Sequence, residues 1–263
     1  MYKNKISKKF ALEGYCIENF VSLKEINYFR KLISQKINKA LNKNNFLNHK
    51  NLNRFHEKNL NEIEEENIVN FANRYIYPNK KYLKKLEKNK VINQIAYDTW
   101  GHNDFSIFWV GSIKKKIFKK GGINYRLAKP GKNSKKKVAG VHCDINVGGE
   151  ICYDKDVLIT AWVPIFGFDK KYSLKIYPKS HLFTHNQKHF SKNSKKISKI
   201  FKKSYYEKFK SLRPSLKIGQ AIIFHPNLLH GGSYNLGQET RLSLEIRFYN
   251  NKNKILWKRK IKN

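Results

Sequence analysis

Three side chains that can hold a metal ion stand in two short stretches of this sequence. In His142-Cys143-Asp144, an imidazole and a carboxylate are separated by one residue. Residues i and i+2 of an extended strand point to the same face, so His142 and Asp144 can bind one ion while Cys143 points away. A third ligand would come from a strand that returns beside this one, and His230 is the natural candidate. Two histidines and one carboxylate occupy one face of an octahedral iron and leave three positions open.

The tripeptide alone is a weak motif. With nine histidines in 263 residues, His-x-Asp arises by chance in roughly one of five such sequences. Cys143 offers a second chemistry, a zinc thiolate, but neighbouring strand residues face opposite ways and do not readily share an ion. The three cysteines, Cys16, Cys143 and Cys152, are odd in number and lack a paired metal spacing, so we expect reduced thiols.

Arg241 is a candidate for binding a carboxylate beside the metal. Alternate residues from Leu242 to Phe248 are apolar, so Arg241 and Ser243 share the opposite face of a predicted strand. An arginine at the start of a strand that pairs near a metal ligand is well placed to form a bidentate contact with a carboxylate that also touches the metal. The sequence equally permits a surface arginine paired with Glu239 or Glu245.

Residues 1–100 predict a helical support for these side chains. Ser22 and Glu25 form a capping box before an amphipathic pattern over 23–41, which predicts a helix there. The other predictions are a short strand at 10–21 entered through Gly14, an Asn-rich loop at 42–53, and helices at 63–75 and 81–99. We expect the apolar faces of the helices to cover the outside of a sheet.

From residue 101 onward, short apolar runs bounded by Gly, Pro, Asn and Lys predict a β-rich fold. The candidate strands are 105–111, 123–128, 138–142, 157–164, 173–177, 220–225 and 241–249. Two polar segments interrupt them: a basic loop at 132–137, and an insert at 184–212 that could form a lid or an edge over a site. We expect one domain over 1–263, with a β core at 101–250 and a basic tail at 251–263.

The charge is the most unusual feature of the composition. A net charge of +36 would ordinarily raise nucleic acid or an anionic membrane as partners. The excess consists of lysine, with only 8 arginines, and arginine is the residue that reads bases and phosphates bidentately. We therefore expect a solvated charge rather than a dedicated nucleic-acid role. No apolar run of membrane length and no leader-like start occur, which predicts a cytoplasmic protein.

In order and spacing, the motifs resemble those of the phytanoyl-CoA dioxygenase family of Fe(II)/2-oxoglutarate oxygenases. The resemblance covers almost the whole chain and implies a dioxygenase that uses Fe(II), 2-oxoglutarate and O2. It also implies a mainly β fold, a double-stranded β-helix or jelly roll flanked by helices from the N-terminal third. The matching segments are Gly14-Tyr15, Phe20-Val21-Ser22, His142-Cys143-Asp144, 160–164, 177–181, 219–224, and His230 with Arg241 eleven residues on.

The resemblance also implies roles for individual residues. Arg241 corresponds to the residue that binds the distal carboxylate of 2-oxoglutarate, and Ser243 is expected to assist it. Trp162 and Tyr125 fall where family members line the cosubstrate pocket. Lys179 departs from the family, which has glycine in this turn. The implied iron ligands are His142, Asp144 and His230.

The function predicted on this basis is hydroxylation of a small polar metabolite, with a carbohydrate or nucleotide-sugar intermediate of surface polysaccharide synthesis as the first expectation. Basic segments at 129–137, 170–179 and 188–203 favour an anionic substrate. Two alternatives remain at this point, a protein that modifies or binds nucleic acid with the same barrel and a barrel without catalysis. Among the other histidines, His181 is expected to be structural or to line the pocket, His225 to be a satisfied residue at the rim of the barrel, and His185 and His189 to be solvated.

Overall fold

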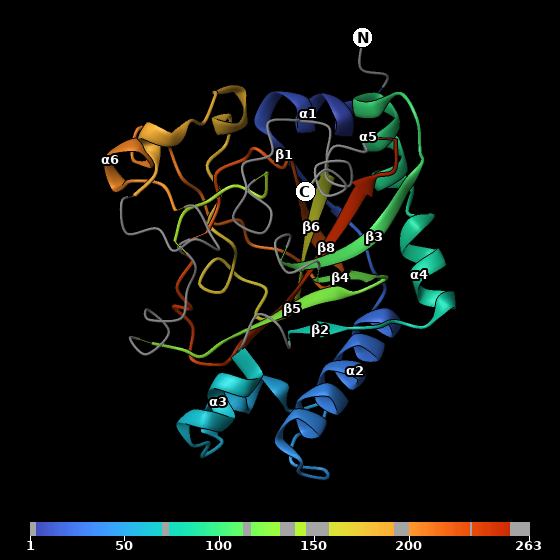
Figure 1. The fold of residues 1–263 in the computed structure, drawn as a ribbon, viewed down its shortest axis with the longest axis vertical. Coiled ribbons are helices and arrows are strands. Elements are labelled where there is room, and N and C mark those ends of the chain that lie inside the picture. The colour runs from blue at the N-terminus through green and yellow to red at the C-terminus, as the bar shows by residue number, and fades with distance from the viewer. Residues whose placement is uncertain are drawn as a thin grey trace, which may run out of the picture.

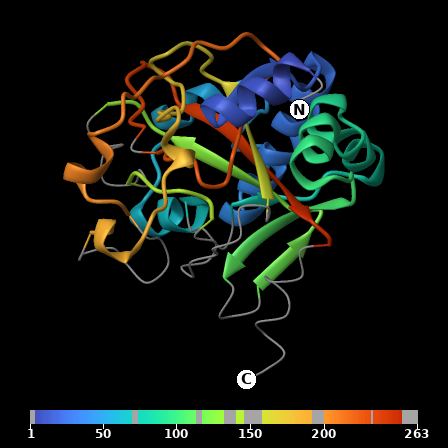
Figure 2. The ribbon, with the colours of Figure 1, turned by 90° about the horizontal axis from the view of Figure 1, so that it is seen from above.

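The computed structural model describes residues 4–69, 74–112, 117–131, 140–145, 158–191, 200–231 and 233–252. Antiparallel strands form a large sheet in the order β1-β7-β6-β8-β3-β4, with β5 pairing both β8 and β2 (Figure 1). Because β8 pairs with β3, β5 and β6, it is the strand that ties the sheet together. Figure 2 shows β3 and β4 extending at one edge. The strands are β1 (Tyr15–Asn19), β2 (Tyr75–Ile76), β3 (Phe105–Ser112), β4 (Ile117–Lys120), β5 (Ile123–Ala128), β6 (Leu158–Phe166), β7 (Gln220–Phe224) and β8 (Arg241–Asn250).

Helices precede and flank the sheet. The capping box predicted for α2 is present, because the Ser22 side chain accepts from the Glu25 backbone and the Glu25 carboxylate accepts from the Ser22 backbone at 2.7 Å. The helix ends at Asn42, whose left-handed φ of 53° stops it. The helices are α1 (Lys5–Glu13), α2 (Leu23–Leu41), α3 (Glu62–Val69), α4 (Lys80–Glu87), α5 (Lys90–Trp100) and α6 (Lys203–Tyr206), with short 3-10 turns η1 (Leu52–Glu57), η4 (Ser180–Leu182) and η5 (Gln187–His189).

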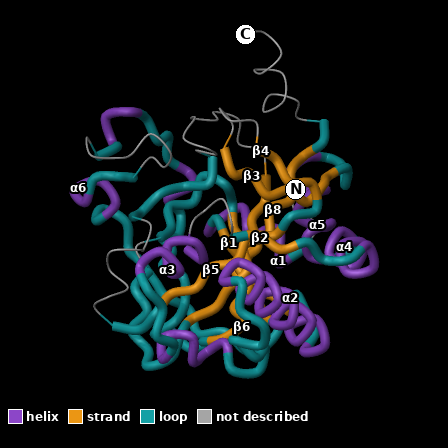
Figure 3. Tube along the Cα trace, turned by 60° about the horizontal axis from the view of Figure 1, so that its bottom comes forward, coloured by secondary structure: helices purple, strands orange, loops and turns teal. Residues whose placement is uncertain are grey.

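Alternation along the strands gives the sheet two chemically different faces. The even residues of β8 from Leu242 to Phe248 share one core cluster with Phe29 and Ile33 of α2. In Figure 3, α1, α2, α4 and α5 lie on one side of the strands, and loops with α6 lie on the other. The odd residues of β8 therefore point away from the helices, toward the loops, which leaves that face available for chemistry.

A second, irregular layer covers this inner face. Its segments meet through isolated bridges rather than regular strands, and His142 and His230 exchange two backbone hydrogen bonds of 2.9 Å. Ile176 bridges both His230 and Leu212. Together the sheet and this layer form the jelly-roll architecture expected of a double-stranded β-helix.

Several predicted elements differ from the structure. The strand predicted at 10–21 begins instead inside α1. Gly14, with a left-handed φ of 82°, ends that helix, and β1 starts at the next residue. The helix predicted over 81–99 is two helices, because the Asn89 side chain accepts from the first backbone amides of α5 and caps it. The strands predicted at 138–142 and 173–177 are absent from the described parts of those ranges, where bridges stand instead.

Parts of the sequence predictions fall outside the described residues. These parts are the basic loop at 132–137, most of the tail at 251–263 and the middle of the insert at 184–212. The described ends of the insert carry η5 and α6. Within the described chain, none of the helices is both long and apolar enough to cross a bilayer.

Candidate metal centre and pocket

His142, Asp144 and His230 converge between the sheet and the bridged layer. One ligand atom from each lies within 4.8 Å of the other two. His230 Nε2 is 3.6 Å from Asp144 Oδ1, and the two imidazole rings have centroids 4.4 Å apart. The backbone bridge between the two histidines fixes this approach, so the three residues singled out in the sequence are brought together although 86 positions separate Asp144 from His230.

Both histidines present the same ring nitrogen to the centre. Nδ1 of His142 lies 2.8 Å from the Gly140 carbonyl, and Nδ1 of His230 lies 2.9 Å from the Leu228 carbonyl. A carbonyl only accepts, so each Nδ1 carries the proton and each Nε2 keeps a lone pair. Burial, followed by the neighbouring His230, lowers the pKa of His142 to about 4. Two imidazole nitrogens beside a carboxylate are a donor set that fits a divalent metal.

Asp144 is held at both oxygens. Thr160 Oγ1 of β6 donates to Oδ2 at 2.7 Å, and Arg247 Nη2 of β8 donates to Oδ1 at 2.8 Å. The carboxylate stands in a turn whose next residue, Ile145, donates its backbone N–H to the Pro226 carbonyl at 2.9 Å. The Asp144 carboxylate is therefore fixed by contacts to β6 and β8 rather than by a strand of its own.

The two cysteines in the described residues, Cys16 and Cys143, are not part of this centre. Cys143 is buried in a separate apolar cluster, and burial raises its pKa well above the ordinary value. Burial also raises the pKa of Cys16 to about 12. Both are free cysteines, and they remain protonated thiols at neutral pH. Cys152 lies outside the described residues.

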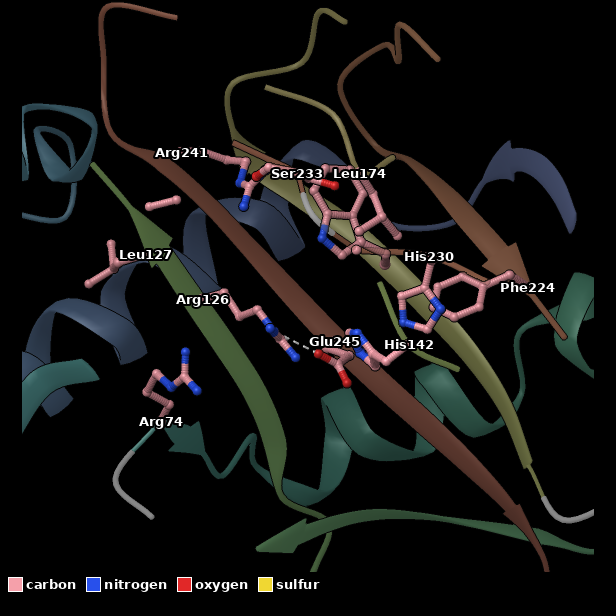
Figure 4. A pocket seen from close by; sticks show the side chains of 13 residues that line it. Arg74, Arg126, Leu127, His142, Leu174, Phe224, His230, Ser233, Arg241 and Glu245 are labelled. Carbon is pink, nitrogen blue, oxygen red and sulfur yellow. Dashed lines mark hydrogen bonds and ion pairs between the residues drawn. The ribbon is translucent and has the colours of Figure 1, made fainter. Parts of the chain in front are cut away.

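A pocket opens beside the three candidate ligands (Figure 4). It combines apolar walls with an unusual number of guanidinium groups, a pattern suited to a polar anionic ligand. Figure 4 shows Arg241 at one end of this pocket, and Arg126 pointing toward Glu245 near His142. The lining residues are Arg74, Arg126, Leu127, Ala128, His142, Trp162, Leu174, Phe224, His230, Gly231, Ser233, Arg241 and Glu245.

Arg241 is a buried cation whose contacts are all backbone oxygens. Its Nη1 donates to the Tyr172 carbonyl at 3.0 Å and to the Ser233 carbonyl at 3.1 Å. Its Nε is buried and has no hydrogen-bond partner among the described residues. Burial, then Arg213 and Arg126, lowers its pKa to about 9. A desolvated guanidinium with an unused donor fits an incoming carboxylate.

The surface pairing that the sequence permitted for Arg241 is wrong. Glu239 accepts instead from Asn53 Nδ2 at 3.0 Å, and Glu245 accepts from Arg126 Nε at 2.9 Å. Arg241 is only 6% exposed. It therefore belongs to the interior of the barrel, which the alternation along β8 alone had not decided.

The remaining residues predicted for the pocket have different placements. Trp162 lines the pocket. Tyr125 packs in the core under the helices and is not among the lining residues, because alternation along β5 turns Arg126 inward instead. Ser243 is buried on the inner face, and its hydroxyl has no hydrogen-bond partner among the described residues. It stands two residues from Arg241 without lining the pocket itself.

Several polar residues near the centre were missed in the sequence. Burial alone would raise the pKa of Glu245, but Arg247 and Arg126 lower it below its ordinary value, so Glu245 is a buried anion. The alternation that joins Arg241 to Ser243 also places Glu245 and Arg247 on the same face, so this pattern could have found them. Arg74 falls within the helix predicted at 63–75, but it stands directly before β2, and its place in the pocket depends on the fold.

Two histidines, His181 before the insert and His185 within it, show that composition alone does not predict which histidines are buried. His185, expected to be solvated, is 7% exposed. Its Nδ1 lies 2.8 Å from the Tyr205 hydroxyl and its Nε2 3.0 Å from the Asn227 carbonyl. Burial lowers the pKa of His185 to about 4. His181 is structural as expected, with its Nε2 2.9 Å from the Ala11 carbonyl of α1.

Comparison with known proteins gives one family and a set of shared folds. A family profile described as "Phytanoyl-CoA dioxygenase (PhyH)" matches residues 10–243. No curated protein sequence matches the chain. The alpha-ketoglutarate-dependent carbocyclase SnoK from nogalamycin biosynthesis is 12% identical with a TM-score of 0.55, covering 94% of this chain and 84% of its own.

Two further solved structures share the fold. EctD from S. alaskensis, solved with 2-oxoglutarate and 5-hydroxyectoine, is 15% identical with a TM-score of 0.54, covering 94% of this chain and 76% of its own. AviO1 from Streptomyces viridochromogenes Tue57 is 11% identical with a TM-score of 0.52, covering 94% of both chains. At such low identity these likenesses concern the fold, and they extend over nearly all of it.

Proposed function

Because this chain belongs to the phytanoyl-CoA dioxygenase family, we propose that it uses Fe(II), 2-oxoglutarate and O2 to hydroxylate a small polar metabolite. The observation that carries the proposal is the convergence of three ligand atoms within 4.8 Å beside a pocket that also holds the buried guanidinium of Arg241. When bound, iron and 2-oxoglutarate supply with O2 the oxidant that converts C–H to C–OH.

In this proposal the metal ligands are His142, Asp144 and His230. The two Nε2 lone pairs and one carboxylate oxygen would hold the ion, a donor set that fits iron chemistry with 2-oxoglutarate and O2. The backbone carbonyls that hold each Nδ1 fix the imidazole planes before any ion arrives. The protein thus contributes three ligand side chains already held in position, in a site whose walls include Trp162 and Phe224.

Arg241 is proposed to bind the distal carboxylate of 2-oxoglutarate. Its Nη1 is anchored by two carbonyls, so the guanidinium is held in one orientation, and its buried Nε has a donor to offer. The hydroxyl of Ser243 is a second buried donor close along the strand, and we propose that it assists. Trp162 supplies an apolar wall, whereas Tyr125 packs on the other face and is assigned no contact.

We propose an anionic substrate, with a sugar phosphate or nucleotide-linked sugar preferred over a lipid thioester. Arg74 and Arg126 line the same pocket as Arg241 and support this preference. Lysines of the basic segments support it less, since Lys129 is paired with Glu65 and Lys179 with Glu13. The apolar part of the lining is limited to Leu127, Ala128, Trp162, Leu174 and Phe224, which favours a compact substrate over a long acyl chain.

Metal binding tests the assignment of the ligands. Anaerobic titration with Fe(II) should show one bound ion, and alanine at His142, Asp144 or His230 should remove most of the affinity because an incomplete face competes poorly with water. His189→Ala is a matched control, because this histidine lies in the insert and is absent from the centre. Full iron binding and turnover by the His142→Ala protein would refute the assignment.

The substrate class is tested by following succinate release on exposure to O2. Sugar phosphates or nucleotide sugars should stimulate release above the background seen with iron and 2-oxoglutarate alone. Acyl-CoA esters should leave the background unchanged. Stimulation by phytanoyl-CoA or similar thioesters alone would refute the carbohydrate preference while leaving the dioxygenase chemistry intact.

A further inference from the structure

A chain of four charged side chains connects the pocket wall to the carboxylate of the metal centre. Arg126 Nε donates to Glu245 Oε2 at 2.9 Å, and the other oxygen of Glu245 accepts from Arg247 Nη2. The same Nη2 donates to Asp144 Oδ1 at 2.8 Å. Asn124 adds a longer contact of 3.4 Å to Glu245. All members stand on β5, β8 or the turn that carries Asp144, so rigid elements hold the chain in place.

The four charges are balanced and largely withdrawn from solvent. The side chains of Asp144, Glu245 and Arg247 are 1%, 7% and 13% exposed, and that of Arg126 is 24% exposed. Two guanidinium groups face two carboxylates, so their charges cancel before a metal arrives. Removing one member of such a buried set leaves an uncompensated charge, which is strongly unfavourable.

The contacts of Asp144 also determine which of its carboxylate oxygens could bind an ion. Thr160 occupies Oδ2 and Arg247 occupies Oδ1, so the group cannot rotate freely. Oδ1 is also the oxygen that lies 3.6 Å from His230 Nε2, on the side of the other ligands. An ion bound at Oδ1 would therefore share that oxygen with the guanidinium of Arg247. A positive charge so close to a divalent ion repels it unless a negative charge offsets the guanidinium.

We propose that Glu245 and Arg247 are positioning residues of the metal centre. Arg247 orients Asp144 so that one oxygen faces the ion, and Glu245 both holds Arg247 in place and cancels its charge. This inference rests on the proposed function, because it requires Asp144 to be a metal ligand. It goes beyond that function by assigning control of the metal affinity and ligand geometry to two residues on β8, Glu245 and Arg247, that are not themselves proposed ligands.

Cobalt(II) binding to the purified full chain tests the proposal, because its visible absorption reports the ligand geometry independently of turnover. Glu245→Gln keeps the shape of the side chain and removes its charge. We expect it to weaken Co(II) binding by about 10- to 100-fold and to shift the absorption bands. Glu245→Gln combined with Arg247→Gln removes both charges, so the double variant should recover part of the lost affinity. Glu239→Gln, at a carboxylate bonded to Asn53, should match the wild type.

The outcomes separate this inference from the proposed function. Failure of the wild-type chain to bind Co(II), or unchanged binding by His142→Ala, would contradict the proposed function itself. Wild-type binding combined with an unchanged affinity and spectrum in Glu245→Gln would overturn only the positioning role, as would a double variant no better than the single one. If Glu245→Gln does not fold, Arg247→Lys serves instead. It keeps the charge but loses the planar fork, so an unchanged Co(II) spectrum would overturn the role.

Discussion

Replacing Arg241 by lysine isolates the contact proposed for 2-oxoglutarate. The substitution keeps a positive charge but loses the planar fork that can bind a carboxylate through two nitrogens. In the structure the guanidinium is fixed by the carbonyls of Tyr172 and Ser233, and its Nε remains available. A lysine ammonium could keep a carbonyl contact or reach the cosubstrate, but its single nitrogen cannot make the carbonyl contacts and the cosubstrate contact together.

The expected loss follows from that count of contacts. One charge-assisted hydrogen bond contributes about 1.5–3 kcal/mol, so the affinity for 2-oxoglutarate should fall about 10- to 100-fold. The site is buried, with Arg241 6% exposed, so water cannot easily replace the lost donor. Metal affinity should stay unchanged, since Arg241 is not among the three converging ligands.

Calorimetric titration of 2-oxoglutarate into the Mn(II)-loaded protein measures this loss. Arg213→Lys is a matched control, because Arg213 also donates to backbone carbonyls, those of Lys171, Ser173 and Tyr234, but does not line the pocket. The control should bind 2-oxoglutarate like the wild type. Unchanged affinity in Arg241→Lys would refute the assignment and direct attention to Arg126, the next guanidinium in the pocket.

Two further predictions concern stability. Lys179 adopts a left-handed φ of 66°, a conformation that glycine reaches without steric penalty. Lys179→Gly should therefore raise the free energy of unfolding by about 1 kcal/mol, whereas Lys179→Ala should not. Equal melting temperatures for the two variants would refute this prediction. His185 is neutral in the folded chain, where its pKa is about 4 against an ordinary 6.5. As the pH falls, the unfolded chain therefore takes up the proton first. The free energy of unfolding should decrease as the pH drops from about 6.5 toward 4. The loss is on the order of 2–3 kcal/mol, measured by denaturant unfolding; an equal pH slope in His185→Gln would contradict this source.

The parts of the fold that the sequence predicted well are those with an unbroken two-residue period. The bounds of β5 match the prediction at 123–128, and β8 begins at the predicted residue. In β8 the period also separated the residues that pack under the helices from those that face the site. Strand alternation is local, so a single sequence contains it in full.

The bridged layer could not be predicted in the same way. Short apolar runs at 138–142 and 173–177 indicate burial, but burial alone does not distinguish a strand from an irregular segment held by single bridges. His142 and Asp144 were expected to share the face of a strand. They converge instead because His142 bridges His230 and because Thr160 and Arg247 hold Asp144. The structure brings the predicted residues together, and the reason for their proximity is long-range.

The structure also changes which charges matter. Lysine dominates the net charge of +36, yet the few arginines are the basic residues that gather at the centre. Three of the eight line the pocket, a fourth holds Asp144, and a fifth is close enough to Arg241 to lower its pKa. A guanidinium keeps its charge when buried and bonds in a fixed plane, whereas an exposed lysine is solvated and mobile. These arginines are Arg74, Arg126, Arg213, Arg241 and Arg247, and the proposed preference for an anionic substrate rests on those that line the pocket.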